Sequence, residues 1–188
     1  MSSTPTVGVL ALQGCIDPHL TILNKLNIPT VKVRTVEDLS RVDRIILPGG
    51  ESTTMLKLLG RTGLEGALID FARTHPVWGI CAGSILLATK VSNPSQRSFG
   101  LIDIHAIRNY YGSQRESFKT SLSIPLIGNE INVDFIRAPK LEPLRDDVEV
   151  LAQYGEDAVL LRAKNIMVSS FHVELSDETR LHQYFAEL

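Results

Sequence analysis

Short, continuous apolar runs recur along the first half of the chain, and turn residues bound each of them. They cover residues 7–12, 30–34, 44–47 and 77–80. Strands that are covered on both faces of a parallel sheet have this pattern, whereas strands with one solvated face alternate between apolar and polar residues. The runs therefore predict a parallel sheet whose strands are joined by right-handed crossovers.

Two of the segments between these runs have helical periodicity. Asp17 is placed to cap a helix that has Pro18 at its first position. The leucines expected on the inner face of this helix are Leu20, Leu23 and Leu26. Residues 64–73 form the second helix. Alternating strands and helices predict an α/β fold with an open, doubly wound, mostly parallel sheet and helices on both faces.

The middle of the chain follows a different pattern, because β-rich pieces succeed one another without a helix between them. These pieces cover residues 102–107, 122–127 and 131–136. They predict a small antiparallel excursion from the main sheet. Further strands are expected at residues 148–154, 158–162 and 166–171, and a closing helix at 177–186 with Asp177 near its start. Since no linker or repeat divides the chain, residues 1–188 are expected to form one domain.

Composition narrows the class of protein. The chain has 188 residues, of which 44% are hydrophobic and 21% charged, and its net charge is −2. This balance is that of an ordinary globular domain and is too weakly basic for a nucleic-acid-binding protein. We expect no membrane span, because no apolar run is long enough, and no export signal is evident. Cys15 and Cys81 are therefore expected to be free thiols in the cytoplasm.

The first candidate for chemistry is Cys81, which lies where a predicted strand turns sharply into a helix. Gly79 and Gly83 flank it in the Gly-x-nucleophile-x-Gly pattern of a nucleophile elbow. The glycines leave room for a strained backbone at the apex, and the start of the helix favours a thiolate. The alternative, a buried structural cysteine, is about equally common for this motif alone.

The second candidate is the pair His172 and Glu174, at the end of a predicted strand. A histidine can take a proton from a thiol and return it to a leaving amine, and a carboxylate can orient the ring. Both side chains lie on the same side of an extended segment. Many His-x-Glu pairs are incidental surface residues, but the position of this pair after an elbow cysteine favours a catalytic role.

A third segment, residues 47–54, leaves a strand through two glycines and enters a helix. Gly49 and Gly50 allow the backbone to approach a ligand and to present N–H groups, as an oxyanion hole requires. The alternative is a tight turn in which Ser52 caps the helix. The segment has no lysine of the kind that a Walker phosphate-binding loop needs.

These segments together resemble the class I glutamine amidotransferases, and in finer detail the family of glutaminase subunits of pyridoxal 5'-phosphate synthase. The matching segments are residues 9–14, 47–54, 77–84, 108–114, 117–118, 135–139 and 171–175. Within them, Pro-Gly-Gly-Glu-Ser-Thr at 48–53 and Arg-Ala-Pro at 137–139 distinguish this family from other amidotransferases.

The resemblance implies hydrolysis of L-glutamine to glutamate and ammonia through a thioester on Cys81, without a cofactor or a metal. The substrate-binding residues that it implies are Gly50, Glu51, Ser52, Arg108, Ile136 and Arg137. The implied oxyanion hole comprises Gly49, Gly50 and Ala82. An arginine fork suits the carboxylate of glutamine, although a surface ion pair is the plainer alternative for either arginine.

The resemblance also implies a partner, a separate synthase that receives the ammonia in a hetero-oligomeric complex. In the family, glutaminase activity is weak or silent until docking completes the oxyanion hole, which makes the Gly49–Gly50 peptide the expected moving part. Residues 13–19 are the expected part of the docking face. Cys15 and His19 in that segment are spaced like metal ligands on a helix, but two ligands without further companions do not predict a metal site.

Other interpretations remain open at this point. The sequence departs from the family pattern at Ile80, Ser84 and Val173, none of which is a reacting group. A different hydrolase with an elbow cysteine is one alternative, although many of those have histidine where this chain has Ala82. A non-catalytic binding subunit is another. The remaining histidines have no partner pattern and are expected to be structural: His75, His105 and His182.

Overall fold

The computed structural model of the chain describes residues 4–111, 117–128 and 130–188. A seven-stranded sheet lies at its centre, with the order β10-β11-β12-β4-β3-β1-β2. The parallel strands are β1 (Val7–Leu10), β2 (Thr30–Val33), β3 (Arg44–Leu47), β4 (Val77–Ile80) and β12 (Ile166–Ser169). At one edge, β11 (Asp157–Ala163) and β10 (Glu149–Tyr154) are antiparallel. The predicted mostly parallel sheet is confirmed.

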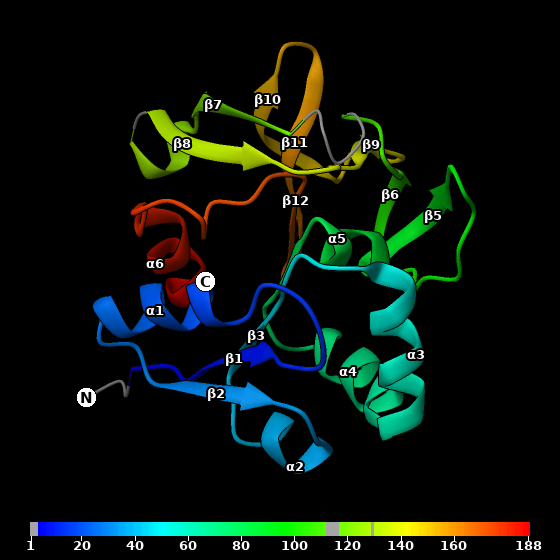
Figure 1. Cartoon of the computed structure of the whole chain (residues 1–188), viewed down its shortest axis with the longest axis vertical. Coiled ribbons are helices and arrows are strands. Elements are labelled where there is room, and N and C mark those ends of the chain that lie inside the picture. The colour runs from blue at the N-terminus through cyan, green and yellow to red at the C-terminus, as the bar shows by residue number, and fades with distance from the viewer. Residues whose placement is uncertain (1–3, 112–116, 129) are drawn as a thin grey trace.

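Helices cover both faces of this sheet (Figure 1). On one face lie α1 (Asp17–Lys25) and α6 (Arg180–Glu187). On the other lie α2 (Val36–Leu39), α3 (Ser52–Thr62), α4 (Leu64–Ala72) and α5 (Ala82–Leu87). Each face of the sheet has its own hydrophobic core, and successive residues of a strand pack into the two cores alternately. Ile45 and Leu47 pack on the α3–α5 side, and Ile46 packs on the α1 side. This alternation explains why the strands read as continuous apolar runs.

The predicted excursion forms two small sheets apart from the main one. The strands β5 (Ala88–Ser92), β6 (Ile102–Ile107) and β9 (Lys140–Pro143) make a three-stranded sheet. A hairpin of β7 (Phe118–Ser123) and β8 (Glu130–Phe135) makes the other. The excursion is therefore confirmed, although β5 pairs with β6 in parallel. Within the described ranges, no helix has both the length and the apolar character needed to cross a membrane.

The start of α1 differs from the prediction. Ile16, not Asp17, occupies the N-cap position, and it makes no side-chain cap bond. Asp17 is the first residue of the helix, and its carboxylate accepts a hydrogen bond from Lys32 at 3.0 Å. The buried face is also rotated, since it comprises His19, Ile22 and Leu23. His19 can lie in the core because it has polar partners there, whereas Leu20 and Leu26 are only partly buried.

Two other predicted boundaries were wrong. The strand expected at 122–127 ends at Ser123 and continues as a 3₁₀ turn, η1 (Pro125–Ile127), because proline cannot donate a hydrogen bond to a strand ladder. The closing helix begins at Arg180 rather than at Asp177. Before it, the Ser176 hydroxyl bonds the Val173 carbonyl at 2.8 Å, which keeps this stretch in a turn.

Candidate active site

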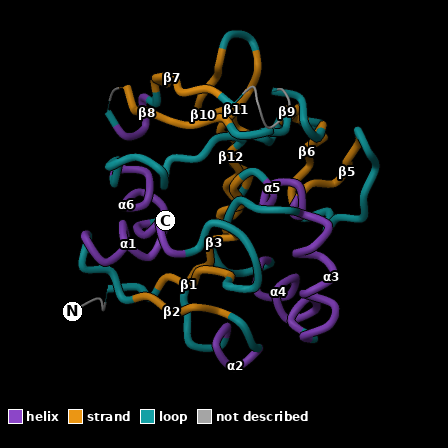
Figure 2. Tube along the Cα trace, viewed as in Figure 1, coloured by secondary structure: helices purple, strands orange, loops and turns teal. Residues whose placement is uncertain are grey.

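The candidate site lies at the carboxyl ends of the parallel strands, where loops leave β1, β3 and β12 (Figure 2). Ligand sites of open α/β sheets commonly occupy this edge. The loops surround a cavity of about 530 Å³. The expected site residues that line it are Gly49, Gly50, Glu51, Ser52, Cys81, Arg108, Ile136, Arg137 and His172. Glu174 lies behind His172 rather than on the cavity wall, and Ala82 is the first residue of α5, next to Cys81.

Cys81 lies at the turn between β4 and α5 with a strained backbone, at φ 48° and ψ −99°. Its N–H donates to the Ser169 carbonyl at 2.8 Å, which fixes the turn against β12. The flanking glycines are required by close packing. A Cβ atom on Gly83 would lie 2.1 Å from the Leu47 carbonyl oxygen, and one on Gly79 would lie 2.7 Å from the Gly83 backbone. The elbow therefore holds the thiol at a fixed place on the cavity wall.

His172 and Glu174 form a buried pair beside the thiol. The His172 Nδ1 atom lies 2.6 Å from Glu174 Oε1. Cys81 is one of the groups that raise the pKa of this ring. Because Nδ1 faces the carboxylate, Nε2 is the ring nitrogen left to take the thiol proton. The backbone of His172 exchanges hydrogen bonds of 2.8 and 2.9 Å with Asp134 of β8, so the hairpin of β7 and β8 anchors the histidine.

The pKa values of this pair are shifted in opposite directions. Burial alone would lower the pKa of His172, but its interaction with Cys81 and its hydrogen bond to Glu174 raise it, as do the charges of both groups. Burial alone would raise the pKa of Glu174, but the hydrogen bond from His172 and nearby histidine charge hold it below its usual range. The arrangement therefore favours an ionised carboxylate facing an imidazole that readily accepts a proton.

Three side chains that the sequence did not single out for the site surround Glu174 on its inner side. His19 Nε2 lies 3.7 Å from Glu174 Oε1, and His19 Nδ1 lies 2.8 Å from His182 Nε2. Burial and the nearby Glu174 carboxylate raise the pKa of the Cys15 thiol to about 12. The sequence offered only weak signals for these residues: the spacing of Cys15 and His19, which did not predict a metal site, and a buried histidine in each of two helices, α1 and α6.

Glu51 caps α3, a position that the alternative interpretation of this segment gave to Ser52. Its carboxylate accepts hydrogen bonds from the backbone N–H groups of Thr53 and Thr54 at 3.2 and 2.7 Å. Burial would raise the pKa of Glu51, but these bonds and those from both threonine hydroxyls lower it to about 2. The carboxylate also lies 3.5 Å from the Arg108 guanidinium. Opposite charges therefore lie together at this end of the cavity.

The Gly49–Gly50 segment is held by the loop that follows β1. The Gly49 carbonyl accepts a hydrogen bond from the Cys15 N–H at 2.8 Å, and the Gln13 side chain accepts one from the Glu51 N–H at 2.9 Å. Gly14 has φ +109°, and a Cβ atom there would lie 2.1 Å from the Gly49 oxygen. The two loops are therefore closely packed against each other and joined by hydrogen bonds.

Ile136 and Arg137 continue from β8 into the cavity wall. The Ile136 carbonyl lies 4.0 Å from the Cys81 sulfur, and Arg137 has a left-handed backbone with φ 48°. Part of the matching segment that contains Arg108, residues 112–114, lies outside the described residues.

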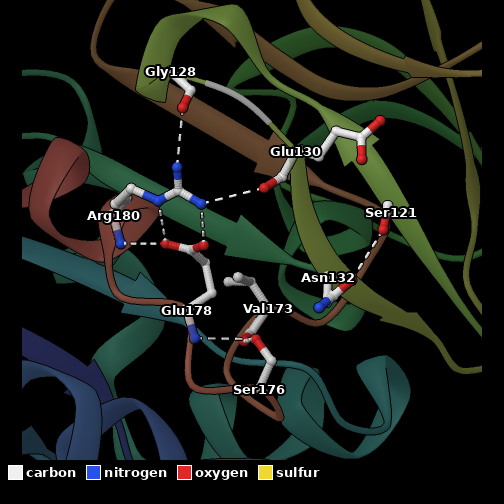
Figure 3. A network of polar contacts seen from close by, with 8 residues as sticks. All are labelled: Ser121, Gly128, Glu130, Asn132, Val173, Ser176, Glu178 and Arg180. Atoms are coloured by element: carbon white, nitrogen blue, oxygen red, sulfur yellow. Dashed lines mark hydrogen bonds and ion pairs between the residues drawn. The ribbon is translucent and has the colours of Figure 1, made fainter.

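Arg180 ties the hairpin to the loop after the candidate triad (Figure 3). Its guanidinium binds the Glu178 carboxylate at 2.6 and 2.9 Å. It also donates to the carbonyls of Gly128 at 3.0 Å and Glu130 at 3.2 Å. Arg180 therefore gives the hairpin of β7 and β8 a second attachment, near the turn between its two strands.

Comparison with known proteins shows the family of this chain. Residues 9–188 match the model of the SNO glutamine amidotransferase family. The chain is 48% identical to pyridoxal 5'-phosphate synthase subunit PdxT of Pseudothermotoga lettingae over 185 residues, which cover 97% of this chain and 95% of that protein. It is 44% identical to the protein of the same name from Thermotoga maritima over 184 residues, or 97% of this chain and 98% of that protein.

Solved structures agree with the family match. The crystal structure of a glutamine amidotransferase has a TM-score of 0.90 at 40% identity, covering 96% of this chain and 97% of that chain. The structure of PurLQS from Thermotoga maritima has a TM-score of 0.68 at 16% identity, covering 98% of this chain and 98% of that chain. The second likeness shows a common fold only.

Proposed function

The chain belongs to the SNO glutamine amidotransferase family, and we propose that it hydrolyses L-glutamine to L-glutamate and ammonia with Cys81, His172 and Glu174 as its triad. The observation that carries the proposal is the arrangement of these groups: a thiol and an imidazole on the wall of one cavity, and a buried carboxylate 2.6 Å behind the imidazole. This is the arrangement that thiol-based acyl transfer needs.

The reaction follows from the roles of these groups. His172 takes the thiol proton, and the Cys81 sulfur attacks the side-chain amide carbon of glutamine. The oxyanion that forms is stabilised by backbone N–H groups of Gly50 and Ala82, next to the paired Gly49. His172 then gives its proton to the leaving ammonia, and a thioester remains. His172 next takes a proton from a water molecule, which attacks the thioester. Glutamate is released, and His172 returns the proton to the Cys81 sulfur.

The charged end of the cavity suits the amino acid head group of glutamine. Arg108 offers a planar fork to the carboxylate, and Arg137 lines the same cavity. Glu51 is ionised and can pair with the ammonium group. The hydroxyl of Ser52 is engaged with Gln96 at 2.8 Å, so Ser52 would contact substrate through its backbone. Ile136 would lie along the reacting end, close to Cys81.

The relatives from Pseudothermotoga lettingae and Thermotoga maritima are named as subunits of pyridoxal 5'-phosphate synthase, and we infer that this chain is a subunit that passes ammonia to a separate synthase chain. Residues 13–19 are the proposed part of the docking face. They adjoin the Gly49 carbonyl through Cys15, so docking can act on the Gly49–Gly50 peptide through a direct hydrogen bond.

We further propose that residues 1–188 form one glutamine amidotransferase domain, because strands from both halves of the chain join in one sheet, in which β12 pairs with β4. Both cysteines are free thiols. A cytoplasmic location, where thiols stay reduced, agrees with a thiol nucleophile.

The test is glutamate release from glutamine, measured with and without the cognate synthase. Cys81→Ala should abolish release while the fold, followed by circular dichroism, stays intact. The matched control, Cys15→Ser, should leave turnover nearly unchanged, because that thiol is not the nucleophile and serine keeps a small polar group beside Glu174. Full activity of the Cys81→Ala variant, or loss of activity in Cys15→Ser alone, would reject the assignment of the nucleophile.

A further inference from the structure

Two fully buried histidines continue the line of polar groups behind Glu174 into the protein core. His19 of α1 and His182 of α6 both have 0% exposure. We propose that His19 is a positioning residue that presents a neutral N–H group to the Glu174 carboxylate, and that His182 fixes the tautomer in which His19 does so. The proposal rests on the proposed function only for its effect on turnover.

The distances select one tautomer. His19 Nδ1 and His182 Nε2 are 2.8 Å apart, so one of them donates a proton and the other accepts it. If His182 donates, a neutral His19 carries its proton on Nε2, which lies 3.7 Å from Glu174 Oε1. If His19 donates instead, its Nε2 turns a lone pair toward the carboxylate, which is repulsive.

The far side of His182 favours the same tautomer. Its Nδ1 atom is buried and has no hydrogen-bond partner. When His182 donates from Nε2, this Nδ1 atom is a bare acceptor, whereas in the opposite tautomer it would be a buried N–H group without an acceptor. Either tautomer leaves one buried N–H group outside hydrogen-bond distance of an acceptor, on His182 Nδ1 or on His19 Nε2. Only the group on His19 lies near an anion, the Glu174 carboxylate at 3.7 Å. Both ends of the pair therefore direct an N–H group of His19 at Glu174.

Charge on either ring is disfavoured. Burial is the main cause that lowers the pKa of His19, to about 4, and burial likewise lowers the pKa of His182. The rings also contact Trp78 edge-on, with ring centroids 6.2 Å from His19 and 5.0 Å from His182. The titratable groups that face this cluster from the surrounding elements are Cys15, Cys81, His172 and Glu174. A neutral dipole, not a second cation, thus faces the carboxylate.

This dipole has a defined effect on the candidate triad. Glu174 has 3% exposure, and its Oε2 atom has no hydrogen-bond partner among the residues that the structure describes. In a weakly screened interior, an N–H dipole aimed at a carboxylate stabilises the anion and fixes its orientation even at 3.7 Å. Removing it raises the proton affinity of the coupled Cys81–His172–Glu174 group, whichever atom holds the proton. Any reaction that needs the deprotonated thiol should therefore reach half of its maximum rate at a higher pH.

Alkylation of Cys81 by iodoacetamide measures this proton affinity without glutamine. The rate at Cys81, followed by peptide mass spectrometry as a function of pH, is compared in the wild-type chain, His19→Phe and His19→Gln. Phenylalanine keeps a ring but has no N–H group, whereas glutamine keeps a neutral N–H donor. The quantity compared is the pH at which the alkylation rate is half of its maximum. We expect this pH midpoint to rise by about one pH unit in His19→Phe and to stay near the wild-type value in His19→Gln. A packing role alone would leave the midpoint in place.

An unshifted midpoint in His19→Phe, or equal shifts in both variants, overturns the proposal. Because His19→Phe can fail to fold, a second measurement uses the wild-type chain: ring ¹⁵N chemical shifts of His19 and His182 at pH 7. Both rings are expected to be neutral and protonated on Nε2, and a proton on Nδ1 of His19 or a charged ring overturns the proposal. A chain that alkylates normally but never releases glutamate would reject the proposed function and leave this inference standing.

Discussion

Gly49 lies flush against the imidazole of His172: a Cβ atom at position 49 would be 2.1 Å from the Cε1 atom of the ring. The His172 ring is held in place, because its backbone is hydrogen-bonded to Asp134 and its Nδ1 atom is hydrogen-bonded to Glu174. A side chain at position 49 must therefore displace the base or the loop that carries the proposed oxyanion hole.

We expect Gly49→Ala to lower kcat by about 100-fold or more, because displacing the base or one oxyanion donor costs that much. Steady-state glutamate release in the presence of the synthase checks it. Gly66→Ala in α4 is the matched control, since a Cβ atom there has nothing within 4 Å. The control should keep full activity and gain about 0.5–1 kcal/mol in free energy of unfolding. A wild-type kcat in Gly49→Ala would contradict the proposed geometry.

The members of the candidate triad should differ in importance. Glu174→Gln should slow thioester formation less than His172→Asn does, because an imidazole without its carboxylate still transfers protons, though less efficiently. Single-turnover acylation measured beside glutamine affinity separates the two effects, and all forms should bind glutamine equally. A large loss of affinity in His172→Asn would instead make that residue a binding group.

The sheet and the glycine-bounded elbow could be predicted because they depend on local pattern. The bounds of β3 and β4 follow directly from apolar runs that end at turn residues, and the elbow from glycines that no other residue can replace. The His19–His182 pair could not be predicted, because it joins residues 163 positions apart through tertiary packing of two helices. The cap at Glu51 was missed for a different, local reason: Ser52 is the commoner cap type, but the Glu51 carboxylate reaches two backbone N–H groups.

The buried, neutral His19 should make the protein less stable in mild acid. Its pKa is lowered to about 4 when folded, and in the unfolded chain it titrates near its ordinary value of 6.5. Between these values the unfolded chain binds more protons, so the free energy of unfolding falls as the pH falls, by about 3 kcal/mol in total. The raised pKa of His172 contributes stability that is lost only as the pH rises above 6.5, so it does not shape this window.

Urea unfolding at pH 7, 6 and 5 measures this slope. His19→Gln should flatten it, because glutamine does not titrate, whereas His75→Gln should retain it, since the ring of His75 is exposed. His182 adds to the slope in the same direction, so a remainder is expected in His19→Gln. Equal slopes in the wild-type chain and in His19→Gln would show that His19 is not held neutral by folding.

Charge reversal at Asp17 tests the proposed docking face. The carboxylate is exposed at the first turn of α1, where it pairs with Lys32, and it follows the segment whose Cys15 N–H holds the Gly49 carbonyl. Asp17→Lys should leave the basal rate of glutamate release unchanged and weaken the severalfold rise expected when the cognate synthase is added, because a rim charge acts mainly on association. It should also destabilise α1 through the helix dipole by about 0.3–1 kcal/mol, which urea unfolding measures separately.

The matched control is Asp70→Lys in α4, an exposed carboxylate paired with Arg73 on the opposite face of the sheet. It carries the same change of charge and should respond to the synthase as the wild-type chain does. If both variants lose the activation equally, the effect is one of net charge and residues 13–19 are not the docking face. If the synthase raises the rate of none of the three chains and light scattering detects no association with it, the chain works alone, and the partner proposal is rejected while the triad stands.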